Sequence, residues 1–124
     1  GLKRRPAVAR NHKLDVMVGC LAIRCVKDTG ASVTTMPESV ALQILNAHVG
    51  KDSTDSDYPI GEIFNYDPPL RLVGFAGLTV EIKYGMIRFV TFVGDNGAKA
   101  MVPIEFRVVP QECCSSGLPL LSAS

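Results

Sequence analysis

The sequence predicts an all-β domain of roughly seven or eight short strands with one helix. Apolar residues make up 47% of the 124 residues, which is enough for a sizeable hydrophobic core. Short runs rich in valine, isoleucine and leucine recur along the chain, and glycine-containing turns separate them. One segment departs from this pattern and has the spacing of an amphipathic helix.

The N-terminal part is expected to hold an irregular arm followed by a β-hairpin. Residues 1–12 contain a cluster of lysine and arginine, and we interpret them as a flexible basic arm that is solvated or contacts an acidic partner. Apolar and polar residues alternate in LDVMVGC (14–20) and again in LAIRCV (21–26). This alternation predicts two antiparallel strands, with a tight turn at Gly19 and Cys20. Residues 13–124 are predicted to form one domain.

A helix is predicted over residues 37–48, after a short extended piece with the sequence SVTTM. Pro37 suits the first helical position, and Glu38 places a carboxylate in the first turn. The apolar residues that follow have helical spacing. The next stretch, residues 49–69, is polar and rich in turn formers, so we expect a long surface excursion there.

The second half is predicted to be β again. Its four strand-like runs are LRLVGFAG, LTVEIKYG, MIRFVTFVGDNG and KAMVPIEFRVVP. Hairpin turns are expected at Tyr84–Gly85 and at Asp95–Asn96–Gly97, because glycine and asparagine favour the backbone of such turns. A loop with the sequence QECCSSG then leads to a final apolar LPLL.

Composition excludes several function classes. A formal net charge of +1 and the absence of tryptophan argue against a nucleic-acid-binding β-barrel that would use the basic arm, because base stacking needs aromatic side chains. No apolar run is long enough to span a bilayer. The four cysteines and two histidines lack the spacing of a metal site, so we expect no metal or cofactor. Free thiols in a reducing, intracellular compartment are expected, although a link between the two cysteine pairs stays open.

One stretch carries candidate chemistry, the run CVKDTGASVT at residues 25–34. Here an apolar, β-branched segment is interrupted by Asp28, Thr29 and Gly30 and then resumes. An aspartate at this place is ordinary if it caps its own turn. It is costly if it is buried, and a buried carboxylate then needs a function.

At Asp28-Thr29-Gly30-Ala31 the chain resembles the retropepsins, the retroviral and retrotransposon aspartic proteases. The resemblance continues in PPLRLVGFAGLTVEIKYG, which is similar to the family's flap hairpin, with residues 74–77 (Gly-Phe-Ala-Gly) at its tip. It continues again in PIEFRVVPQECCSSGLPLL, which is similar to the closing stretch of retrotransposon members. The match covers about residues 14–121.

The resemblance implies a closed β-barrel or sandwich with a flap, and an aspartic endopeptidase that processes a polyprotein. Asp28, Thr29 and Gly30 would be the catalytic residues. The substrate peptide would contact Ala31 and the flap residues, which are Gly74, Phe75, Ala76 and Gly77. Because one chain supplies one such aspartate, the enzyme would be a homodimer with Asp28 of each chain at the two-fold axis. The resemblance also implies a cytoplasmic or virus-like-particle location, with no nucleic-acid or membrane partner.

The sequence differs from the family pattern at three places. Lys27 precedes Asp28 where an apolar residue is usual, Ser122 replaces a glycine in the closing motif, and neither the helix nor the terminal strand that the family carries after it is evident. An alternative interpretation is therefore a retropepsin-like module that binds peptides or dimerises without cutting. KDTGAS also resembles the phosphorylated motif of ion-pumping ATPases, but the lysine lies on the wrong side of the aspartate.

Overall fold

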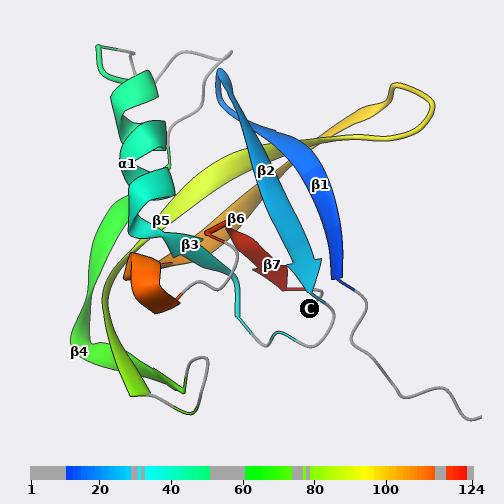
Figure 1. The fold of residues 1–124 in the computed structure, drawn as a ribbon. Coiled ribbons are helices and arrows are strands. Elements are labelled where there is room, and N and C mark those ends of the chain that lie inside the picture. Colours follow the sequence, from blue (N-terminus) through cyan, green and yellow to red (C-terminus); the bar gives the residue numbers. More distant parts are fainter. Residues whose placement is uncertain are drawn as a thin grey trace, which may run out of the picture.

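A computed structural model describes most of the chain, and Figure 1 shows its arrangement. The described residues are 11–28, 31, 33–50, 61–73, 77, 79–113 and 117–122. Their strands are β1 (Asn11–Val18), β2 (Leu21–Asp28), β3 (Thr35–Pro37), β4 (Ile63–Val73), β5 (Thr79–Val93), β6 (Lys99–Val109) and β7 (Leu120–Ser122). One α-helix, α1 (Glu38–Ala47), and a 3-10 helix, η2 (Gln111–Cys113), complete this part of the chain.

Six of the strands close into a barrel. Neighbouring strands hydrogen-bond in the order β1-β2-β7-β3-β6-β5, and β5 returns to β1 through the pairs Met17↔Thr91 and Val18↔Val90. The pairs β2–β7 and β3–β6 are parallel, and the others are antiparallel. β4 lies outside this ring, paired with β5 alone. The predicted all-β class with one helix is therefore confirmed.

The predicted N-terminal hairpin is confirmed. β1 and β2 pair from Val18↔Leu21 at the turn to Asn11↔Asp28 at the far end. Gly19 in the turn has φ +60, a left-handed backbone that favours glycine. β1 begins at Asn11, earlier than the expected start at residue 14, because its backbone stays paired with β2 as far as Asp28. Residues 1–10 of the predicted arm lie outside the described residues.

The predicted helix is confirmed to within one residue at each end. α1 runs from Glu38 to Ala47, and Pro37, with φ −60, occupies the position before its first residue. Val40, Ala41 and Ile44 are buried along one face. This face packs on β3 and β6, so the helix covers one side of the barrel (Figure 1). No helix in the described part of the chain is long and apolar enough to cross a membrane.

Two predictions for the middle of the chain were wrong. The expected surface excursion over 49–69 ends earlier, because β4 already begins at Ile63; residues 51–60 lie outside the described residues. The expected turn at Tyr84–Gly85 does not exist, since β5 continues through it from Thr79 to Val93. A β-carbon on Gly85 would lie 2.5 Å from Oη of Tyr66 and 2.9 Å from the Phe106 carbonyl oxygen. The absence of a side chain at Gly85 therefore lets β4 and β6 lie close to β5, and the chain does not reverse at this glycine.

The predicted turn at Asp95–Asn96–Gly97 is confirmed between β5 and β6. Gly97 has φ +80, and its N–H donates to the carbonyl of Gly94 at 2.9 Å. The N–H of Gly94 in turn donates to the carbonyl of Ala98 at 2.8 Å. The Asn96 side chain accepts a hydrogen bond from the Ala98 N–H at 3.0 Å, which closes the turn.

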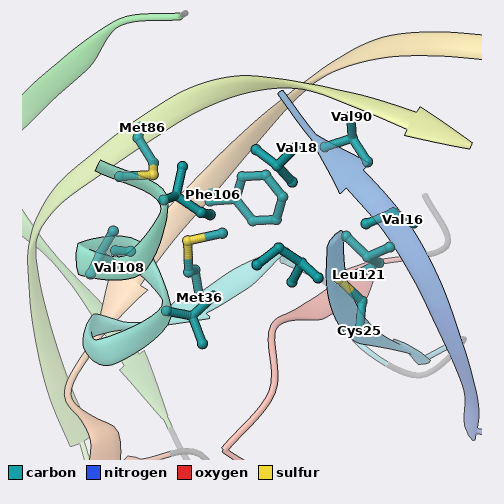
Figure 2. Packing of buried hydrophobic residues seen from close by; sticks show 13 residues of the cluster. Val16, Val18, Cys25, Met36, Met86, Val90, Phe106, Val108 and Leu121 are labelled. Carbon is teal, nitrogen blue, oxygen red and sulfur yellow. The ribbon is translucent and has the colours of Figure 1, made fainter. Parts of the chain in front are cut away.

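The hydrophobic core fills the barrel and extends beneath α1. Phe106 of β6 lies near its centre and is 1% exposed, with side chains from β1, β3, β5 and β7 around it (Figure 2). Met36 and Met86 are fully buried in the same cluster. Burial of an aromatic side chain of this size stabilises the fold by about 1.5–3 kcal/mol.

A buried arginine connects β5 to the chain that precedes β4. Arg88 is 3% exposed, and its Nη1 donates to the carbonyls of Gly61 at 3.0 Å and Ile87 at 2.8 Å. Desolvation lowers the pKa of this guanidinium. The N–H of Ile87 also donates to the Glu62 carbonyl at 2.8 Å. These bonds hold residues 61 and 62 against β5 and so determine where β4 begins.

Candidate active site

Asp28 is the last residue of β2, at the end of the barrel where β2 and β7 meet. Its backbone lies opposite Ser122 in the parallel β2–β7 pair and opposite Asn11 in the antiparallel β1–β2 pair. The residue is half-buried. Figure 1 shows the arrowhead of β2 ending beside β7. Three strands therefore fix the backbone from which the Asp28 carboxylate projects.

A backbone hydrogen bond joins residues 28 and 31 at the end of β2. The N–H of Ala31 donates to the Asp28 carbonyl at 3.2 Å, which closes a four-residue turn over residues 28–31. Ala31 is half-buried. Thr29 and Gly30, which the resemblance assigns to the catalytic motif, lie outside the described residues. The carboxylate is thus at the strand end, on the first residue of a tight turn.

Ser122 attaches this turn to β7. Its hydroxyl donates to the Ala31 carbonyl at 2.9 Å, and its backbone N–H donates to Oγ1 of Thr34 at 3.0 Å. The Thr34 carbonyl accepts a further hydrogen bond from the N–H of Arg107 in β6, at 3.0 Å. The segment after Asp28 is therefore held at both of its ends, to β7 and to β6.

Lys27 lies next to Asp28 in sequence but belongs to the other face of β2. Successive side chains on a strand point to opposite faces, so Lys27 shares a face with the core residue Cys25 and not with Asp28. It is exposed at the rim of a cavity of about 550 Å³. The apolar walls of this cavity include Leu14, Phe92, Val102, Ile104 and Leu121. The polar residues Thr34, Glu105 and Ser122 also line it, so it adjoins the hydrogen bonds around Asp28.

The sequence that predicts a flap lies on a hairpin, formed by β4 and β5. The two strands pair up to Val73↔Thr79, and the loop between them contains Gly77, which is exposed and has φ +75. A side chain at Gly77 would be strained by this left-handed backbone. Gly74, Phe75 and Ala76 lie outside the described residues.

Sequence reasoning missed two residues of this site and recorded a third as a mismatch. Thr34 was assigned to an extended segment without a role, and Arg107 to a strand. Ser122 was seen as a departure from the family's glycine, whereas its hydroxyl is one of the bonds that hold the turn. The signal in the sequence was the placement of two hydroxyl residues, Thr34 and Ser122, close to the turn and to the closing LPLL. The two residues are 88 positions apart in the sequence, so no local sequence pattern predicts their contact.

The arrangement can present one carboxylate on a rigid turn. Neither a scan against protein-family models nor a search of curated proteins finds a match to this chain. In the strand register Asp28 is opposite Asn11 and Ser122, so neither of the two strands paired with β2 places a second carboxylate opposite it. Among the described residues no three histidine, cysteine or acidic side chains gather as a metal site would require. Cys20, Cys25 and Cys113 are free thiols.

Proposed function

We propose that this chain is one half of an aspartic endopeptidase of the retropepsin type, which cleaves a polyprotein as a homodimer. The observation that carries the proposal is the Asp28 turn. A carboxylate at the end of a barrel strand starts a four-residue turn with the sequence Asp-Thr-Gly-Ala, and Ser122 and Thr34 connect that segment to β7. The N–H of Arg107 in β6 also donates to the Thr34 carbonyl, so two distant strands support this segment, which a turn with a self-capping aspartate does not need.

The proposed chemistry uses two carboxylates and one water. Two such groups a few ångströms apart cannot both ionise, so the pair shares a proton and titrates as a unit. The ionised Asp28 takes a proton from water while the protonated one hydrogen-bonds the carbonyl of the scissile peptide. Water attack forms a tetrahedral diol, and proton transfer to nitrogen releases the amine. No covalent acyl-enzyme forms in this sequence.

Rigid support of Asp28 matters because the dyad depends on distance. A shift of about 1 Å in a catalytic group can reduce the rate by about a hundredfold. The hydrogen bonds from Ser122 and from the N–H of Arg107 limit such shifts in each subunit. The β4–β5 hairpin would fold over the bound peptide, add backbone hydrogen bonds as an extra strand and exclude water.

The position of Lys27 is compatible with this chemistry. A cation that faced the carboxylate would favour its ionised form and hinder proton sharing. Lys27 instead lies on the strand face of Cys25, at the rim of the apolar cavity. The mismatch with the family pattern at this position therefore does not count against the proposal.

The test measures cleavage and assembly together. The chain is incubated with a peptide library across acid to near-neutral pH, and its sedimentation is followed with and without an inhibitor of the pepstatin type. We expect cleavage next to apolar side chains and a dimer that the inhibitor stabilises. Asp28→Asn should abolish cleavage and preserve the circular dichroism spectrum, because the amide cannot act as a base.

Asp95→Asn is the matched control, since it changes the same functional group in the β5–β6 turn. This variant should cleave like the wild type. Full activity of the Asp28→Asn variant would refute the mechanism. A dimer that binds the inhibitor or peptides without cutting them would instead favour the alternative interpretation, a retropepsin-like module that binds peptides but does not cleave them.

A further inference from the structure

A thiol and an imidazole meet where the β1–β2 turn contacts the C-terminal end of α1. The β1–β2 turn and this end of α1 both lie toward the top of the view in Figure 1. Sγ of Cys20 lies 3.8 Å from Nε2 of His48 and 3.7 Å from the Ala47 carbonyl oxygen. The backbone N–H of Cys20 also points to Nε2, at 3.4 Å. Cys20 is exposed, so solutes can reach this sulfur.

The hydrogen bonds of His48 determine which ring nitrogen faces the thiol. Nδ1 lies 2.7 Å from the Ile44 carbonyl oxygen, and because a carbonyl can only accept, Nδ1 must carry a proton. In the neutral ring Nε2 is then the basic nitrogen, directed at Cys20. Protonation at Nε2 leaves the bond from Nδ1 to the Ile44 carbonyl intact, so this bond still holds the ring to α1. The long hydrogen bond that Nε2 accepts from the Cys20 N–H is then lost, because a protonated Nε2 can only donate.

Gly19 makes room for this contact. A β-carbon at Gly19 would overlap Nε2 of His48, and the backbone there is left-handed with φ +60. The glycine lets the imidazole pack directly on the turn that carries Cys20. The contact joins two elements 28 residues apart, which fixes the distance between sulfur and base in the folded chain.

From this geometry we propose that Cys20 is a redox modification site at which His48 is the general base, and that its reaction partner is a small disulfide such as oxidised glutathione. The Cys20 S–H proton moves to Nε2, and the sulfur attacks one sulfur of the disulfide. The S–S bond of the disulfide breaks as the new S–S bond forms. The second sulfur leaves as a thiolate and is protonated from the imidazolium, so Cys20 is oxidised and one small thiol is released.

The test compares cysteines within one molecule. The reduced full chain is exposed to oxidised glutathione at neutral pH, and samples taken over time are digested with trypsin. Residues 14–24 then report Cys20, and residues 108–124 report Cys113 and Cys114 together. Because an ordinary thiol is only a few per cent ionised at neutral pH, base assistance should make Cys20 react about tenfold faster per thiol. In urea this advantage should vanish.

His48→Gln is the decisive variant, because glutamine can still accept the Cys20 N–H but is not a base. It should reduce the Cys20 rate about tenfold, to that of the other peptide, whereas His12→Gln, an exposed histidine on β1, should leave the rate unchanged. Equal rates for the two peptides in the folded wild type would overturn the proposal, even if His48→Gln failed to fold. An unchanged Cys20 rate in a folded His48→Gln variant would overturn it too.

Discussion

Replacement of Ser122 by alanine tests whether the Asp28 turn depends on β7. The change removes the hydroxyl that donates to the Ala31 carbonyl at 2.9 Å and leaves the backbone bond from the Ser122 N–H to Thr34 in place. A neutral hydrogen bond of this kind contributes about 0.5–1.5 kcal/mol to the free energy of unfolding. Because Ala31 and Ser122 are half-buried and water can reach part of the site, we expect a loss of about 1 kcal/mol.

The loss should be measurable both in the free energy of unfolding and in hydrogen exchange at the turn. For a domain of this size, about 1 kcal/mol corresponds to a decrease of about 4 °C in Tm. Urea unfolding should give a lower midpoint with an unchanged slope, at one fixed protein concentration so that self-association does not contribute. Hydrogen exchange should accelerate most at the Ala31 amide, which closes the turn on Asp28. Amides of the core strand β6 that exchange through global unfolding should accelerate by no more than about fivefold, which is what a loss of about 1 kcal/mol requires.

Ser39→Ala is the matched control. Its hydroxyl donates to the side chain of Gln111 at 2.6 Å on an exposed surface, so its loss should cost less and should not affect exchange at Ala31. The reasoning would be refuted if Ser122→Ala unfolded like the wild type and Ala31 exchanged at the wild-type rate. The Ser122 hydroxyl would then make no measurable contribution to stability, and the residues of the turn itself would hold its conformation.

Two further predictions concern the barrel itself. Gly85→Ala should lower the free energy of unfolding by about 1–3 kcal/mol, because its β-carbon would meet Tyr66 and the Phe106 carbonyl. Gly94→Ala at the exposed β5–β6 turn is the control and should have little effect. Equal urea midpoints for the two variants would contradict this prediction. Burial, with a smaller contribution from the Asp15 charge, raises the pKa of the Cys25 thiol from 9.0 to about 11. The folded state therefore holds this proton more tightly, so the contribution of Cys25 to stability should be constant below pH 9 and fall by at most about 3 kcal/mol as the pH rises to 11. Cys25→Ala should lack this component of the alkaline decrease, and parallel pH curves for the two proteins would show that the thiol does not contribute.

Local signals predicted the elements that depend on neighbours in sequence. Alternation and a glycine-containing turn identified the β1–β2 hairpin. Pro37, followed by residues with helical spacing, identified α1 to within a residue at each end. The Asp95–Asn96–Gly97 turn was found for the same reason, because its hydrogen bonds join residues at most four positions apart. The Asp28 motif was likewise visible as a break in an apolar run.

The local sequence around a glycine or proline did not predict its structural role where that role depends on a neighbouring strand. Gly85 has the same local context as a turn glycine, but its lack of a side chain serves the approach of Tyr66 and Phe106. The paired prolines Pro68 and Pro69 suggested a surface loop, yet both lie in β4. β4 pairs with β5 alone, and this pairing is interrupted between Asn65 and Leu70, so both prolines lie in an irregular part of an edge strand where no ladder hydrogen bond is lost.

By itself the sequence determined the composition of the core, the strand and helix signals, and the presence of an aspartate in a turn that resembles a protease motif. The tertiary structure decided that β1 returns to β5 and closes the barrel, and that Ser122 holds the turn. These outcomes depend on contacts between residues far apart in the chain. The free energy of such contacts comes from burial and hydrogen bonding in the assembled barrel, so no local pattern of residues encodes them.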